Sequence, residues 1–295
     1  MTKKSTEKKP ATDKFQWMTE QFISLIEKGV NPWRKEWQGG DDEIMNFLTK
    51  EPYKGRNPLI LTMDTLFRGA DHPFYCGAQQ GFAKGWTLKK GCKSAYVTYA
   101  NVVIKEGEGD EDDKKAFFVK WYPVFNINCW EDANSDHKLV DYLPSPSTPI
   151  NHDDRLAVVD QFIKDSNATI KTQGSQPCYI PSEDTILMPK WENFSNAGAY
   201  YGTALHELTH WTGHKSRCNR DQRGEFGTAS YAKEELIAEM GAALLCHHFQ
   251  VKSDLENHAS YLKGWLSKAK EDPKFLFNSM GEARKAFEFL IDSQG

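Results

Sequence analysis

The chain has 295 residues, of which 39% are hydrophobic and 13% aromatic, and its formal net charge is −4. This composition can bury a sizeable interior, which excludes a globally disordered protein, and the length favours two domains over one core. Six cysteines without a C-x-x-C pair favour free thiols over a zinc ribbon or a dense disulfide framework. The sequence contains neither an apolar leader nor a long apolar run, so we expect a cytoplasmic protein with no membrane partner.

The first predicted elements are helices. Residues 1–12 are polar and lysine-rich, so we expect a disordered tail there. Asp13 can cap a helix that ends near Gly29, because apolar residues recur along one side of it at positions 15, 18, 22 and 25. A second, short helix is predicted from Leu59 to Phe67.

Strands are predicted for much of the remaining first half. Residues 85–99 should form strands and turns, and residues 96–104 should pair with residues 115–124. The intervening residues 106–113 are mostly acidic, which is typical of a solvated hairpin loop. Together these elements predict an α+β domain over residues 13–140.

A proline-rich segment, residues 141–153, is predicted to be a linker to a second domain, residues 154–295. That domain should be α+β as well. It is expected to have a helix near residues 156–165 and strands at 168–171, 178–180 and 185–188. The last of these is predicted to be an edge strand, with which an extended substrate would pair. Two amphipathic helices should follow, at about 254–270 and 279–292.

One helical stretch of the second domain carries a metal-binding pattern, H-E-x-x-H, within residues 201–211. Positions i and i+4 lie on one face of a helix, so His206 and His210 can bind a single zinc ion. Glu207 would lie beside the ion as the general base. The alternative is an ordinary, partly buried helix, but the residues further along the chain favour zinc.

A catalytic zinc usually has three protein ligands. The metzincin pattern would place its third histidine at Ser216, so that pattern is excluded. A predicted helix over residues 231–245 carries Glu235 and Glu239 on one face. This pair resembles the thermolysin-like gluzincin pattern, in which one acid binds the metal and a second, four residues later, holds a histidine ligand. We assign these roles to Glu235 and Glu239 respectively, with the reverse assignment as the alternative.

This ligand set predicts a hydrolase that cleaves an amide, most plausibly a peptide bond in a host protein. Two imidazoles and one carboxylate leave a position for water, whose pKa falls toward neutrality. Glu207 would accept the water proton and pass it to the leaving amine. Tyr231 and His214 are the candidate donors to the oxyanion. Glu234, by contrast, is expected to be a surface residue in an ordinary ion pair.

Aromatic and cationic residues are interleaved in the first half. Single-stranded nucleic acid binding needs this combination, because bases stack on rings while Lys and Arg neutralise phosphates. The alternative is ordinary core aromatics flanked by solvated charges. The candidate DNA-binding residues are Trp33, Arg34, Lys35, Trp37, Tyr53, Lys54, Arg56, Trp86, Lys89, Lys90 and Lys93.

From about residue 14 to its end, the chain resembles the ArdC family of plasmid antirestriction proteins. The first half is similar to that family's domain for single-stranded DNA, at residues 27–37, 53–57 and 124–126. The second half is similar to its zincin-like metallopeptidase domain, at residues 200–213, Arg217, Arg220 and 231–239. The resemblance implies a protein of a conjugative plasmid that protects incoming DNA from host restriction, with single-stranded DNA as its partner.

Two alternatives remain open at this point. In the first, the protein only binds single-stranded DNA and its zinc is purely structural. In the second, it is a protease with no nucleic-acid role, and its first half is an exosite for protein substrates. Retention of Glu207 together with the ligands argues mildly against a purely structural zinc.

Overall fold

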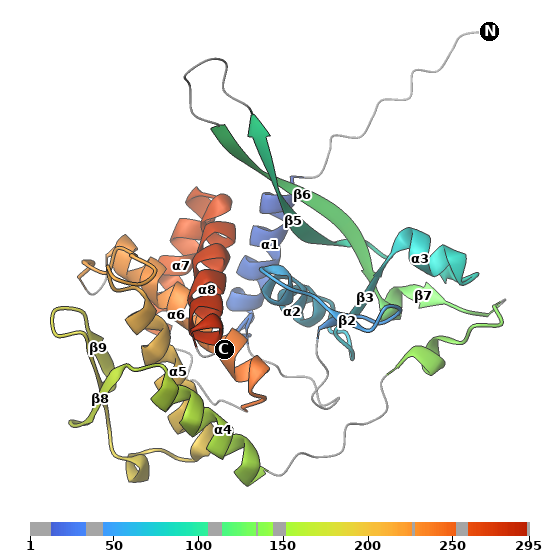
Figure 1. Ribbon diagram of the computed structural model, residues 1–295. Coiled ribbons are helices and arrows are strands. Elements are labelled where there is room, and N and C mark those ends of the chain that lie inside the picture. The colour runs from blue at the N-terminus through green and yellow to red at the C-terminus, as the bar shows by residue number, and fades with distance from the viewer. Residues whose placement is uncertain are drawn as a thin grey trace, which may run out of the picture.

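The computed structural model describes residues 13–33, 44–105, 114–133, 135–143, 152–225, 228–251 and 259–293. The first half is built on a five-stranded sheet with strand order β2-β1-β3-β6-β5 (Figure 1). Its strands are β1 (Met45–Asn46), β2 (Glu51–Pro52), β3 (Phe74–Gly77), β5 (Ala95–Lys105) and β6 (Lys114–Asn126). The predicted pairing of two long strands is confirmed: β5 and β6 form an antiparallel ribbon that extends away from the rest of the sheet.

Three helices accompany this sheet: α1 (Lys14–Glu27), α2 (Asn57–Arg68) and α3 (Ala78–Ala83). The predicted cap of α1 is confirmed, because the Asp13 carboxylate accepts hydrogen bonds from the backbone N–H groups of residues 15 and 16. At the start of α2, the Asn57 side chain bonds both the N–H and the C=O of Thr98. Because β5 is an edge strand, this contact satisfies backbone groups that would otherwise be open.

A small two-stranded sheet adjoins the main one. Strands β4 (Thr87–Leu88) and β7 (Trp130–Glu131) pair antiparallel, and short 3₁₀ helices lie on either side of β7 at Ile127–Cys129 and Leu139–Tyr142. The predicted linker therefore begins inside the second of these helices. Most of it, residues 144–151, lies outside the described residues.

The second half begins with α4 (His152–Asp165) and a three-stranded sheet of β8 (Thr169–Thr172), β9 (Cys178–Ile180) and β10 (Thr185–Met188). The prediction that residues 185–188 form an edge strand was wrong. Strand β10 is central, parallel to β8 and antiparallel to β9, and its residues are mostly buried. The alternation of short strands in the sequence did not reveal this order, because strand order depends on long-range pairing.

Four longer helices complete the chain: α5 (Ala197–Thr212), α6 (Ala229–His248), α7 (Ala259–Glu271) and α8 (Lys274–Asp292). They follow the short 3₁₀ helix at Trp191–Asn193. The predicted helix at 279–292 was too short, since α8 already begins at Lys274. Among the described residues, no helix is both long and apolar enough to span a bilayer.

The largest hydrophobic core is shared by the two halves. Helices α1 and α2 supply Met18, Phe22 and Leu59, and these pack with residues of α6, α7 and α8 such as Leu236 and Phe275. Figure 1 shows α1 and α2 lying against this helical group. The predicted α+β fold class with two domains is confirmed, but helix α6 belongs structurally to both halves.

Candidate metal centre

Helix α5 presents two histidines on one face. The Asn196 side chain caps its first turn by accepting the N–H of Ala199 at 2.9 Å. Buried Leu205 and Leu208 anchor the opposite side in a second hydrophobic core. His206 and His210 are one turn apart, and their ring centroids lie 4.8 Å from each other. The predicted helical spacing is therefore present in the structure.

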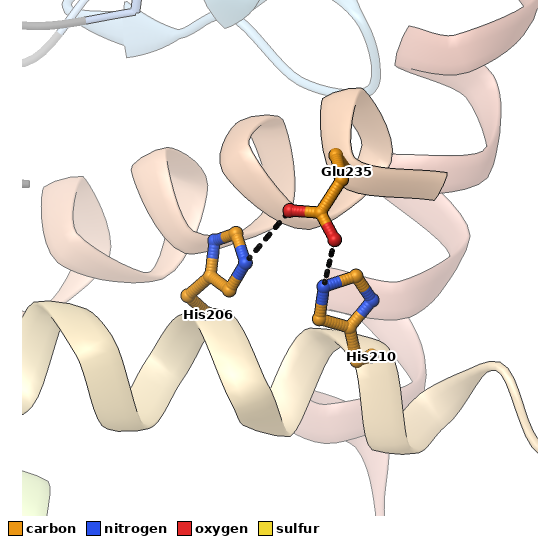
Figure 2. A group of neighbouring side chains, drawn as sticks. All are labelled: His206, His210 and Glu235. Atoms are coloured by element: carbon orange, nitrogen blue, oxygen red, sulfur yellow. Dashed lines mark ion pairs between the residues drawn. The ribbon is translucent and has the colours of Figure 1, made fainter. Parts of the chain in front are cut away.

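Helix α6 crosses α5 and directs Glu235 at both rings (Figure 2). Nε2 of His206 lies 3.6 Å from one carboxylate oxygen, and Nε2 of His210 lies 3.5 Å from the other. The three donor groups lie within 4.8 Å of one another. Two imidazole nitrogens and one carboxylate oxygen, converging from two helices, form a donor set that suits zinc and other divalent transition metals.

The second nitrogen of each ring faces a different carboxylate. Nδ1 of His210 is hydrogen-bonded to Glu234 at 3.2 Å. Nδ1 of His206 lies 3.8 Å from Glu239, which is too long for a hydrogen bond, and no described residue offers it one. The predicted contact of Glu239 with a histidine is therefore not a hydrogen bond to Nδ1 of His206, whereas Glu234 makes such a bond with His210.

Glu234 is held in turn by a buried cation, Arg220. The guanidinium donates to both carboxylate oxygens, at 3.0 and 2.8 Å. It also donates to Thr212 Oγ1 at 2.8 Å and to the C=O of Thr209 at 2.7 Å, so it ties Glu234 to the end of α5. The expectation that Glu234 is a surface residue was wrong, since it is only 6% exposed. The sequence does not show how α6 is rotated against α5, so it could not distinguish a buried Glu234 from a surface residue.

These contacts shift the ionisation of the site. Burial lowers the pKa of His210, but hydrogen bonds to Glu234 and Glu235 outweigh burial and raise it to about 10. Burial raises the pKa of Glu234, but His210 and Arg220 overcome this and lower it to about 2. For His206 and Glu235 the same competition raises the imidazole pKa and lowers the carboxyl pKa.

The surplus of buried acid fits a divalent cation. Four glutamates near the two imidazoles are 6–8% exposed: Glu207, Glu234, Glu235 and Glu239. Arg220 is bonded to one member of this group, Glu234. Buried carboxylates are stable only when they are paired with positive charge or coordinate a metal. The donor set and the net charge therefore both indicate a metal centre.

A cavity of about 770 Å³ opens onto the two histidines, Glu207 and Glu235. Its wall includes Cys178 and Tyr179 of β9, which is an edge strand of its sheet, unlike the predicted residues 185–188. Tyr231, one of the two candidate oxyanion donors, also lines the cavity. His214 is not among its lining residues, and its Nδ1 is hydrogen-bonded to Ser216 Oγ at 2.8 Å.

The candidate DNA-binding residues of the first half are dispersed. Trp33 and Trp86 are core residues, 7% and 1% exposed, so the prediction that these rings stack on bases was wrong. Cations flank both rings in the sequence, and that pattern does not distinguish a core ring from a surface ring. Arg34, Lys35 and Trp37 lie outside the described residues.

The remaining candidates lie at or near the surface. Tyr53 is half-buried, and the Arg56 guanidinium lies over the Phe277 ring at 4.5 Å. Sequence reasoning missed two exposed rings on the long ribbon, Tyr99 and Tyr122. Period-two alternation could not have indicated them, because it places both rings on the same side of the ribbon as the buried Val97 and Val124. The exposed lysines of the prediction are Lys54, Lys89, Lys90 and Lys93.

Two families match separate halves of the chain. Residues 157–282 match a family described as a zincin-like metallopeptidase. Residues 12–125 match the N-terminal domain of anti-restriction factor ArdC.

Similar proteins were found both by sequence and by structure. DNA primase TraC of Escherichia coli is 30% identical over 286 residues, which is 93% of this chain but only 19% of the primase. The chain thus spans about a fifth of that relative. Uncharacterized protein y4eC of Sinorhizobium fredii (strain NBRC 101917 / NGR234) is 28% identical over 311 residues, and the match spans all of this chain and 96% of that protein.

Two solved structures of the antirestriction ArdC protein from plasmid R388 have the same fold. The metal-free structure superposes with a TM-score of 0.73 and the Mn(II)-bound structure with 0.74. Both are 30% identical to this chain, and 96% of this chain is covered. The similarity covers 98% and 99% of the two solved chains, respectively.

Proposed function

The chain belongs to the ArdC antirestriction family, and from that premise we propose that it is a metal-dependent peptidase joined to a module for single-stranded DNA. In this proposal, residues 154–295 carry the peptidase and residues 13–140 bind the DNA. The protein acts in the bacterial cytoplasm, including that of a recipient cell in conjugation, where it protects an incoming strand from host restriction.

The observation that supports peptidase activity is the convergence of His206, His210 and Glu235 beside Glu207 in one cavity. We propose that these two histidines and Glu235 bind Zn²⁺; a relative's structure holds Mn(II). The cation would supply Lewis-acid character, which polarises a carbonyl and acidifies water. Glu207 lies in the same cavity and would serve as the general base and then as the proton donor to the leaving amine.

Two further features of the cavity suit a peptide substrate. Strand β9 is an edge strand of its sheet and borders the cavity, so an extended peptide can add to it through backbone hydrogen bonds. Tyr231 lines the same cavity and would donate a hydrogen bond to the developing oxyanion. These features favour hydrolysis of a peptide bond in an unfolded or extended segment of a host protein.

A single substitution tests the catalytic role. Glu207→Gln should leave metal content unchanged, because Glu207 is not one of the three donor residues, and should abolish cleavage of a random peptide mixture monitored by mass spectrometry. Metal content is measured in parallel by elemental analysis of protein purified without chelators. Equal cleavage by wild type and Glu207→Gln protein would refute the peptidase proposal.

The two alternatives make different predictions in a conjugation assay for antirestriction. A purely structural metal predicts that Glu207→Ala retains full antirestriction, whereas His206→Ala unfolds the second half. A protease without a nucleic-acid role predicts that the wild-type protein binds no labelled single-stranded DNA, or binds single strand and duplex equally across a salt titration.

DNA binding is supported by similarity to a DNA primase and to the ArdC N-terminal domain over residues 12–125. The strand that enters a recipient in conjugation is single-stranded, so a protein that coats it would restrict access by host nucleases. Fluorescence anisotropy with labelled single-stranded and duplex oligonucleotides tests this part of the proposal. We expect tighter binding of the single strand, with affinity falling as salt increases.

A further inference from the structure

Trp33 and Trp86 are buried, but the first half of the chain has exposed aromatic rings elsewhere. We propose that single-stranded DNA binds midway along the β5–β6 ribbon, across a surface formed by Tyr99, Lys120 and Tyr122, which we term the tyrosine face. This inference rests on the proposed DNA-binding function of the first half and identifies where the strand lies.

Strand register places these three side chains on one side of the ribbon. Tyr99 is paired with Lys120, and Val97 is paired with Tyr122. Directly opposed residues of an antiparallel pair point to the same side, and residues two apart along a strand share that side. The Tyr99 and Tyr122 rings are diagonal neighbours, with centroids 5.4 Å apart and planes at 79°.

On this side of the ribbon, the side chains change from buried to exposed along the strands. Ala95, Val97 and Val124 are at most 5% exposed and pack in a core with α2. Tyr99 and Tyr122, immediately beyond them, are 52% and 44% exposed. Rings with a purely structural role would be covered like their neighbours, so these two are available to stack on bases.

Positive charge accompanies the exposed rings. Lys120 is exposed between the two tyrosines, and none of the described carboxylates lies within ion-pair distance of it. Lys54 is exposed as well, in a turn next to the tyrosine face, because the neighbouring Tyr53 packs against the core cluster that contains Val97 and Val124. Lysines that are not engaged with protein carboxylates are suited to neutralise phosphates.

A second basic element borders this turn. A Cβ atom at Gly55 would lie 3.6 Å from Cδ of Arg284 in α8, so that arginine lies against the turn. Burial and the neighbouring Arg284 lower the pKa of Arg56, whereas Glu282 and Glu288 raise it, and Arg284 donates to both carboxylate oxygens of Glu288. The turn therefore meets the second half of the chain at Arg284, whose charge is already paired with Glu288.

The chemistry favours a single strand over a duplex or a protein. Unpaired bases expose their faces to aromatic rings, whereas the bases of a duplex are stacked on one another. Stacking depends little on base identity, so we expect binding that is tolerant of sequence. RNA presents the same faces and phosphates, and an RNA arm of the experiment distinguishes it from DNA.

The test measures anisotropy of a fluorescein-labelled oligothymidylate with the full chain. We expect Tyr99→Ala and Tyr122→Ala each to weaken binding about five- to 150-fold, the range that corresponds to loss of one base stack. Tyr99→Phe should bind like the wild type, because the ring is retained. Lys120→Gln should lower the slope of log affinity against log salt by about 0.7, the contribution of one phosphate contact on a single strand.

Phe82→Ala is the matched control, because Phe82 is a similarly exposed ring (53%) on α3 in the same half of the chain. It should bind oligothymidylate as tightly as wild type, and all variants should retain the wild-type thermal midpoint. Wild-type affinity in both tyrosine-to-alanine variants would overturn the tyrosine face while leaving DNA binding intact. Absence of binding by the wild type would instead refute the DNA-binding function, and tighter binding of oligouridylate would overturn the choice of DNA.

Discussion

The two candidate metal-binding histidines differ in how closely a glutamate contacts the second nitrogen of the ring: Glu234 contacts His210, and Glu239 contacts His206. Glu234 is hydrogen-bonded to His210, and it accepts hydrogen bonds from Nε and Nη2 of Arg220. It also accepts one from the side-chain amide of Gln222 at 3.0 Å. Glu239 is 3.8 Å from the corresponding nitrogen of His206. A carboxylate that accepts from the ring N–H fixes the tautomer and raises the basicity of the ligand. His210 is therefore the more firmly held of the two histidines.

The first prediction follows from this difference. Glu234→Gln should weaken Zn²⁺ binding about 10- to 100-fold, the usual effect of losing such a carboxylate, as measured by competition with a chromophoric chelator. Lys233→Ala is the control, since Lys233 is an exposed neighbour on the same helix. Unchanged affinity in Glu234→Gln would show that the contact with His210 does not orient the ligand.

A second prediction concerns the ion pair between Arg217 and Asp184. Arg217 donates to both carboxylate oxygens, and its hydrogen bond, opposed by burial, holds the pKa of Asp184 below its usual 3.8. A carboxylate whose folded pKa is depressed stabilises the protein above the unfolded pKa, and this contribution disappears as pH falls through the folded value.

Asp184→Asn should therefore lower the free energy of unfolding at neutral pH. The difference from the wild type should shrink as the pH falls below 3.8 and through the lowered pKa of Asp184. Urea unfolding of both proteins across this pH range measures the difference. The effect should be small, about 1 kcal/mol or less, because the Asp184 side chain is 38% exposed and solvent screens the pair. A difference that does not depend on pH would exclude this ion pair as its source.

At the scale of elements, the crossing of α5 and α6 sets the distance between the histidines and Glu235. Gly241 of α6 lies against Thr209 of α5: a Cβ atom there would be 2.4 Å from Thr209 Cγ2 and 2.9 Å from its Oγ1. Thr209 is fully buried, and its hydroxyl donates to the C=O of Leu205 at 2.8 Å. A β-branched side chain held in this way cannot rotate away from an added methyl group.

Gly241→Ala should therefore push the two helices apart, although alanine is the better helix former. We expect a loss of about 1–3 kcal/mol in the free energy of unfolding, typical of overpacking, together with weaker Zn²⁺ binding. Urea unfolding and chelator competition measure the two effects. A more stable protein with unaltered metal affinity would show that the crossing is not tight enough to position the ligands.

At the scale of the whole molecule, α6 joins the metal site to the first half. Glu235 and Glu239 lie on its cavity side, while Leu236 and Met240 pack in the core that α1 and α2 complete. An ion that binds only the folded state stabilises everything that unfolds with the site. The structure therefore predicts that metal binding protects the N-terminal helices as well as the metallopeptidase half.

Hydrogen exchange with and without Zn²⁺ tests this coupling. At a free ion concentration of 100 times Kd, the stabilisation should be about 2.7 kcal/mol, and it should appear in the amides of α1 and α2 as well as in those of α5 and α6. His206→Ala should abolish the effect in both halves. Protection confined to the second half would mean that the shared core does not unfold as one unit.

Local sequence patterns predicted the main helices and the ribbon. The cap at Asp13, the apolar spacing of α1 and the i,i+4 histidines of α5 all express periodicities within a single element. The pairing of β5 with β6 likewise followed from alternation around an acidic loop. These features depend on neighbours in sequence, so the chain alone was sufficient.

Contacts between distant segments required the tertiary structure. Whether Glu234 faces the solvent or His210 depends on the rotation of α6 against α5, and whether Trp86 binds DNA or fills the core depends on packing with residues about 40 positions away, such as Trp130. The edge position of β9 depends on strand order. Sequence determined which residue types could do chemistry, whereas packing decided which of them meet, because burial and contact are properties of the whole folded chain.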